Sequence, residues 1–126
     1  MMPIIDSSVF IASFLTNDSQ HVKAQEPLGG LERITCTEYV VLEVVTALRT
    51  KKENALAYQF LDLIRRGSDV EILHSTPALF SESATLFRSG KYPKLSFVDT
   101  SLVVLSRHHK VATFDRSLSH AIAAHR

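Results

Sequence analysis

Short apolar segments alternate with longer amphipathic segments along this sequence of 126 residues. Four of the apolar segments have the length of strands, and they cover residues 3–5, 33–35, 70–73 and 110–114. The amphipathic segments between them space apolar side chains three and four residues apart, as helices do. A parallel pair of strands needs a long crossover connection, which a helix supplies. The sequence therefore predicts an α/β domain of three layers, with a mainly parallel sheet covered on both faces.

Several predicted helices begin after a residue that can cap a helix N-terminus. Thr37 and Ser96 stand directly before two of them, and Thr76-Pro77 opens a third. Gly67 is suited to the C-terminal cap of another helix. A polar turn is expected over 16–20. Ser7 or Ser8 can cap a first helix that runs to about Leu15. We expect further helices from Thr37 to about Lys51 and over 54–66, 77–89, 97–108 and 118–125, with a short one over 21–28.

Charge and cysteine content limit the class of protein. The 14 Lys and Arg residues nearly balance the 13 Asp and Glu residues, so a nucleic-acid partner would have to bind a local patch. The single cysteine, Cys36, excludes an intrachain disulfide and fits a reducing compartment. Residues 1–15 lack the basic start of a signal peptide, and no run approaches the roughly 18 apolar residues of a membrane span. We expect one cytoplasmic domain, residues 1–126, with no membrane partner.

Four acidic residues stand where a solvated surface residue is not expected. Asp6 and Asp115 directly follow the first and the last predicted strand, and open α/β sheets bind ligands at the carboxyl ends of their strands. Glu43 lies on or beside the apolar stripe of its predicted helix, and Asp99 does the same in a later helix. No Lys or Arg stands four residues away from either of these two.

A shared metal site would explain these positions. Burying ionised carboxylates costs free energy unless an opposite charge or a metal compensates, and clustered carboxylates raise one another's pKa. A hard divalent cation, Mg²⁺ or Mn²⁺, is suited to carboxylate oxygens. The alternative for Asp6 is a simple N-cap. The alternative for Asp99 is a first-turn residue stabilised by the helix dipole.

Four short motifs, in this order, resemble the pattern of PIN-domain ribonucleases. They are Ile4-Ile5-Asp6-Ser7-Ser8, Leu42-Glu43-Val44, Ser96-Phe97-Val98-Asp99 and Ala112-Thr113-Phe114-Asp115. Their acidic residues are separated by 37, 56 and 16 positions. Each motif alone is weak, but the ordered set is fairly specific, and the resemblance covers nearly the whole chain. The length and the element order are also similar to those of VapC-type toxins from prokaryotic toxin–antitoxin pairs.

The resemblance implies a single Rossmann-like three-layer α/β/α sandwich, with a mainly parallel sheet of four or five strands. It implies a metal-dependent endoribonuclease that hydrolyses RNA phosphodiester bonds with Mg²⁺ or Mn²⁺. Ser7 and Thr113 would orient ligands or water beside the metal. The implied partners are an RNA substrate, a small inhibitory antitoxin and a second copy of the chain. The catalytic and metal-binding residues would be Asp6, Glu43, Asp99 and Asp115.

Two further features bear on these partners. Arg116, directly after Asp115, is a candidate for holding the RNA backbone. The mixed apolar faces of the predicted helices 54–66 and 77–89 could supply a homodimer surface.

One departure from the family pattern leaves alternatives open. Many relatives carry a further acidic residue shortly after the last motif aspartate, whereas Arg116-Ser117-Leu118 follows here. A second metal site is therefore in doubt. The main alternative is a catalytically weak or inactive PIN-fold module that binds RNA or protein. A third hypothesis is a metal-dependent phosphatase or a nuclease that acts on DNA.

Overall fold

Four parallel strands form the sheet in the described part of this protein. The computed structural model describes residues 3–15, 20–24, 33–66 and 69–125. The strand order is β3-β2-β1-β4, and all three neighbouring pairs are parallel. The predicted α/β fold with a parallel sheet is confirmed. The strands are β1 (Ile4–Ile5), β2 (Ile34–Thr37), β3 (Val70–Leu73) and β4 (Val111–Ala112).

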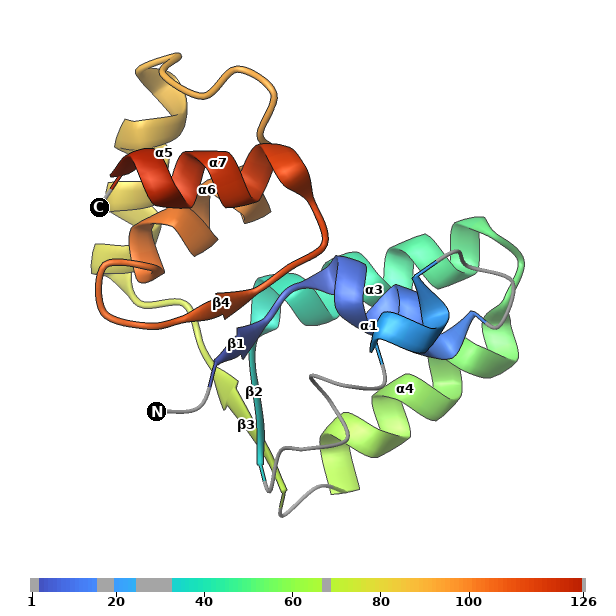
Figure 1. The fold of residues 1–126 in the computed structure, drawn as a ribbon. Coiled ribbons are helices and arrows are strands. Elements are labelled where there is room, and N and C mark those ends of the chain that lie inside the picture. Colours follow the sequence, from blue (N-terminus) through green and yellow to red (C-terminus); the bar gives the residue numbers. More distant parts are fainter. Residues whose placement is uncertain (1–2, 16–19, 25–32, 67–68, 126) are drawn as a thin grey trace.

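Helices lie on both sides of this sheet (Figure 1). One group contains α1 (Ser7–Phe14), α3 (Glu38–Thr50) and α4 (Asn54–Arg66). The other group contains α5 (Pro77–Arg88), α6 (Phe97–Leu105) and α7 (Arg116–His125). Helix α3 packs against α1 and α4, α6 packs against α5 and α7, and α3 also meets α6. These two groups are the outer layers of the predicted sandwich.

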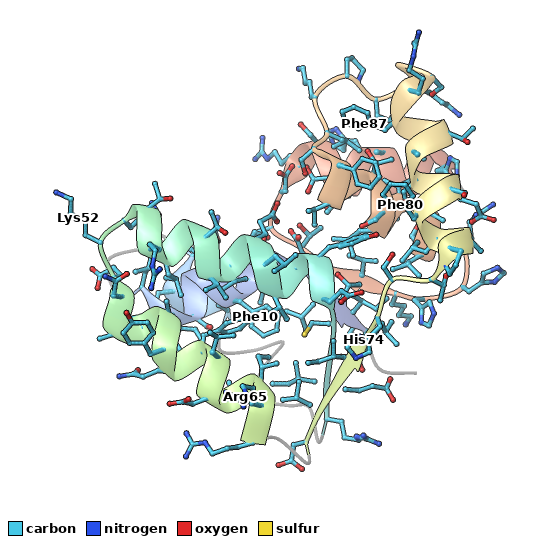
Figure 2. All side chains as sticks on the ribbon, turned by 180° about the vertical axis from the view of Figure 1, so that it is seen from behind. Phe10, Lys52, Arg65, His74, Phe80 and Phe87 are labelled. Atoms are coloured by element: carbon cyan, nitrogen blue, oxygen red, sulfur yellow. The ribbon has the colours of Figure 1, made fainter. Side chains whose placement is uncertain are left out.

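Aromatic side chains fill the core between α1 and α4. Phe10 and Phe60 are almost completely buried, and their rings meet edge to face with centroids 5.3 Å apart. Phe14 meets the same Phe60 ring at 5.7 Å. Figure 2 shows Phe10 in the interior between α3 and α4. Edge-to-face pairs add stabilisation beyond the burial of their area, so Phe60 anchors α4 to the rest of the fold.

The N-caps predicted at Thr37, Thr76 and Ser96 are present. The cap predicted at Ser7 or Ser8 is wrong, because α1 already begins at Ser7 and Asp6 stands at its N-cap position. The Thr37 hydroxyl oxygen accepts the Val40 N–H at 3.1 Å, and the Thr76 hydroxyl oxygen accepts the Leu79 N–H at 3.0 Å. Ser96 caps α6 in a reciprocal capping box with Asp99. Each cap satisfies backbone N–H groups that a helix start leaves without a carbonyl partner.

Several predicted boundaries are wrong. Strand β2 covers Ile34–Thr37 and not 33–35. Helix α6 ends at Leu105 and not near His108, because the amides of Arg107 and His108 bond to carbonyls three residues back and close a tight turn. Helix α7 begins earlier than predicted, at Arg116. Strand β4 is limited to two residues, within the predicted 110–114.

Other predicted features lie partly outside the described residues. Residues 21–24 are helical, within the predicted helix 21–28, and 25–28 are outside the described part. The predicted C-cap at Gly67 and most of the predicted turn over 16–20 also lie outside it.

The packing predicts a large loss of stability for Phe60→Ala. The substitution removes a fully buried ring that touches two other rings, and we expect the free energy of unfolding to fall by about 3–5 kcal/mol. Leu63→Ala, on the same helix but 41% exposed, should cost less than about 1 kcal/mol. Urea denaturation measures both. Equal losses for the two variants would contradict the assignment of Phe60 to the core.

Candidate metal centre

The carboxyl ends of β1 and β4 bring Asp6 and Asp115 to the same edge of the sheet. Ile5 pairs with Ala112 across these two strands, and the Asp6 N–H donates to the Ala112 carbonyl at 2.9 Å. Asp6 follows β1 directly and is only 2% exposed. Parallel neighbours end at a common edge, which is where ligands bind in open α/β sheets.

Two helices add carboxylates at this edge. Glu43 comes from the middle of α3, and Asp99 comes from the first turn of α6. Asp6, Glu43 and Asp99 each offer one oxygen, and these three oxygens all lie within 4.8 Å of one another. We call this group the acidic triad. Asp115 is outside this group, so the structure brings together three of the four predicted ligands.

Asp6 does not act as a side-chain cap. It stands at the N-cap position of α1, yet its side chain makes no capping hydrogen bond. Its Oδ2 instead accepts hydrogen bonds from the Ser8 hydroxyl at 2.9 Å and from the Thr113 hydroxyl at 2.7 Å. The capping alternative for Asp6 is therefore wrong.

Asp99 and Asp115 do act as caps, but each with one oxygen. Asp99 Oδ2 accepts the Ser96 N–H at 3.1 Å in the capping box of α6. Asp115 Oδ1 accepts the Leu118 N–H at 3.0 Å in the first turn of α7. Within the described chain, the second oxygen of each carboxylate accepts no hydrogen bond, so capping leaves it available for a ligand.

Serine and threonine hydroxyls hold the remaining carboxylates. Ser7, which we singled out in the sequence, donates to Glu43 Oε1 at 2.5 Å. Thr113, the other residue singled out, donates to Asp6 as described above. Ser8 was missed as a site residue, although it also contacts Asp6. Its place two residues after Asp6 was the only signal in the sequence, and the same place suits an ordinary helix start.

The carboxylates of the site perturb one another. Burial raises the pKa of the Glu43 carboxyl above its usual range. The Ser7 hydrogen bond opposes this rise, and the negative charges of Asp6, Asp99 and Asp115 add to it. Burial likewise raises the pKa of Asp99, against the Ser96 hydrogen bonds and together with the charges of Asp6 and Asp115. Asp115 thus acts on the triad through its charge even though it lies outside it.

The donor set fits a hard divalent cation. All ligand atoms of the triad are carboxylate oxygens, and such oxygens suit Mg²⁺ and Mn²⁺. The only thiol, Cys36, is buried in β2, and burial raises its pKa to about 11. A soft metal that needs thiolate ligands therefore has no suitable donor among the triad residues.

Arg116 lies beside this centre in the sequence. It is the first residue of α7, its side chain is exposed, and it forms no hydrogen bond or ion pair with the described part of the chain. Its guanidinium is thus available to a ligand that approaches the edge of the sheet.

The fold and site define an α/β protein with an acidic centre at the carboxyl edge of a parallel sheet. The PIN domain family model matches residues 4–123, and the chain belongs to the PIN domain family. In fold it is similar to Mycobacterium tuberculosis VapC20, which is described as a toxin that cleaves the sarcin–ricin loop. The TM-score is 0.81 and the identity is 23%, over 94% of this chain and 93% of that chain. No curated protein matches the sequence significantly. Among the described helices, none is long and apolar enough to cross a membrane.

The raised pKa of Glu43 predicts how stability depends on pH. The folded state holds this proton more tightly than the unfolded chain, so the metal-free protein loses stability as pH rises from near 4.5 through the raised pKa. Glu43→Gln removes this penalty and keeps an oxygen for Ser7. We expect the melting temperature at pH 7, in the presence of a chelator, to rise by about 3 °C. Scanning calorimetry measures it.

The exposed Glu53 provides the control for this test. Glu53→Gln should leave the pH dependence of the melting temperature unchanged. A lower melting temperature for Glu43→Gln at pH 7 would contradict the electrostatic strain inferred for Glu43.

Proposed function

We propose that this protein is a VapC-like toxin, a metal-dependent endoribonuclease that hydrolyses RNA phosphodiester bonds at the acidic triad with Mg²⁺ or Mn²⁺. The observation that carries this proposal is the convergence of three carboxylate oxygens within 4.8 Å in a member of the PIN domain family. The similarity in fold to VapC20, described as a toxin that cleaves an RNA loop, supports it.

The residues of the site would have different roles in the reaction. Asp6, Glu43 and Asp99 would bind the ion, with Asp115 contributing negative charge from the end of β4. The ion would supply Lewis acidity, which activates a water molecule and offsets charge on the phosphate. Glu43 and Asp99 have raised pKa values, which suits a carboxylate that orients or deprotonates the attacking water. Ser7 and Thr113 would keep Glu43 and Asp6 in place.

The proposed partners are an RNA substrate and an antitoxin. Arg116 is exposed and without an internal partner in the described chain, so it would hold the RNA backbone near the acidic triad. The negative triad would also attract a basic side chain, and we propose that a small cognate antitoxin inhibits the protein by placing such a group there. The RNA substrate places the proposed activity in the cytoplasm.

A homodimer is also proposed, through the face of α5 that carries two exposed phenylalanine side chains. Phe80 and Phe87 project from this helix (Figure 2) and are 55% and 50% exposed. The centroids of both rings lie 5.7 Å from that of the Phe97 ring. The apolar face of α4 offers less free surface to a partner, because Arg49 already donates to the hydroxyl of the exposed Tyr58 and lies over its ring. A second copy that covers the α5 face would bury these rings.

An inactive PIN-fold module that binds RNA or protein is the second candidate function. The position of Asp115 outside the triad favours it, as does the absence of an acidic residue over 116–118. Such a module would bind its partner equally well without metal.

Asp6→Asn and Asp99→Asn should each lower RNA cleavage by roughly 100-fold or more, because each removes a charged ligand of the ion. Asn can still accept the hydrogen bonds that Asp99 and Asp6 now accept, so both variants should fold. Cleavage of RNA, single-stranded DNA and a phosphomonoester is measured with Mg²⁺, with Mn²⁺ and with a chelator. Asp62→Asn, at an exposed position on α4, is the control and should be fully active.

The outcomes separate the candidate functions. Cleavage of RNA alone, lost in both site variants, supports the proposal. Unchanged cleavage in both variants would contradict the assignment of the acidic triad as the catalytic metal site. Metal-independent RNA binding with no cleavage would favour the inactive module, and turnover of DNA or the phosphomonoester would favour the third hypothesis.

The dimer proposal predicts that the double variant Phe80→Asp with Phe87→Asp is monomeric. Two charges on the α5 face would be buried without partners in the dimer, which costs far more than exposure to water. Sedimentation velocity compares it with the wild type and with Tyr58→Asp, which should remain dimeric. A wild type that is monomeric at micromolar concentration would rule the dimer out.

A further inference from the structure

The hydroxyl of Ser8 contacts groups from two separate strand ends. Ser8 lies in the first turn of α1, directly after β1. Its Oγ donates to Asp6 Oδ2 at 2.9 Å and accepts the Phe114 N–H at 3.0 Å. Phe114 belongs to the segment between β4 and α7, 106 positions further along the chain. One side chain therefore joins the start of α1 to the segment that carries Asp115.

The single proton of each hydroxyl determines the direction of these hydrogen bonds. A hydroxyl has one proton, and both Ser8 and Thr113 direct theirs to the same oxygen, Asp6 Oδ2. Their lone pairs accept the N–H groups of Phe114 and Asp115, each at 3.0 Å. The Ser8 and Thr113 hydroxyl oxygens also lie 3.3 Å apart, but neither has a second proton to donate to the other. They lie close together because both donate to the same oxygen of Asp6.

This arrangement leaves the other oxygen of Asp6 for a ligand. Asp6 Oδ1 has one contact, the Ser7 hydroxyl at 3.5 Å, and the proton of that hydroxyl goes to Glu43 at 2.5 Å. The two donors on Oδ2 fix the rotation of the carboxyl group. Oδ1, which the Ser7 hydroxyl approaches while it donates to Glu43, is thereby kept available for a ligand.

We propose that Ser8 is a positioning residue of the metal centre, which couples Asp6 to the segment 113–115 and so fixes the first ligand relative to the charge of Asp115. This inference rests on the proposed function, since it presumes that the acidic triad binds a divalent ion. Outer partners of metal ligands typically contribute 10- to 100-fold to metal affinity. Ser8 therefore affects the affinity for the ion, in addition to holding two segments together.

Titration calorimetry with Mn²⁺ tests the role of Ser8. Ser8→Ala should weaken Mn²⁺ binding by roughly 10-fold or more, and Ser8→Thr, which keeps a hydroxyl, should bind within about threefold of the wild type. Ser13→Ala is the matched control, because Ser13 lies on the same helix and donates only to the Phe10 carbonyl of that helix at 2.7 Å. It should bind Mn²⁺ as the wild type does. Thermal melting of each variant shows that it is folded.

A double-mutant cycle separates positioning from a general loss of packing. If Ser8 couples Asp6 to the Asp115 segment, the loss of Mn²⁺ affinity in the double variant should differ from the product of the losses in Ser8→Ala and Asp115→Asn. We expect this difference to be roughly threefold or more. Ser7 contacts Glu43 and not this segment. The effects of Ser7→Ala and Asp115→Asn should therefore multiply within about twofold.

Hydrogen exchange gives a readout that needs no metal. The Phe114 amide donates to Ser8, so it should exchange faster in Ser8→Ala and at the wild-type rate in Ser8→Thr. Wild-type Mn²⁺ affinity in Ser8→Ala would overturn the role of Ser8 while leaving the proposed function intact. A wild type that binds no Mn²⁺ would overturn both. Equal weakening in Ser8→Ala and Ser13→Ala would overturn the positioning role, because it would show that loosening α1 anywhere suffices.

Discussion

The carboxyl group of Asp6 is buried at the end of a two-residue strand, and its burial depends on contacts from several segments of the chain. A buried carboxylate costs free energy unless its oxygens find donors. Here the donors come from two segments that are adjacent only because β4 pairs with β1. Ser8 arrives from the start of α1, and Thr113 arrives from the end of β4. The parallel pairing at the edge of the sheet is thus a condition for burying Asp6 and, through it, for assembling the acidic triad.

These donors leave the carboxylates of the site without a cationic partner in the described chain. Within the described chain, the partners of the four acidic residues are hydroxyls and backbone N–H groups, and no Lys or Arg forms a salt bridge with them. Neutral donors fix the geometry without cancelling the charge. The cost appears in the raised pKa values of Glu43 and Asp99, which report that burial and mutual repulsion disfavour their charged forms. An arrangement that is strained when empty gains the most from a cation, and functional sites often trade stability in this way.

Local patterns in the sequence predicted most of the fold and part of the site. The alternation of strands and helices, the caps at Thr37, Thr76 and Ser96, and the strand-end position of Asp6 all follow from neighbours within a few residues. The role of Ser8 does not, because its partner Phe114 is 106 positions away and only the folded sheet brings the two together. The end of α6 was misplaced for a related reason. The segment 106–109 keeps helix-like composition, but the amides of Arg107 and His108 bond to carbonyls three residues back.

Capping and metal binding do not compete at this edge of the sheet, because a carboxylate has two oxygens. One oxygen of Asp99 and one of Asp115 hold the first turns of α6 and α7, while one oxygen of Asp6 and one of Glu43 accept hydroxyl protons. The four remaining oxygens accept no hydrogen bond shorter than 3.5 Å from the described chain. The same side chains can therefore set where the helices begin and still keep oxygens available for a ligand. For this reason the first-turn position proposed as the alternative for Asp99, which is found in the structure, does not argue against a metal centre.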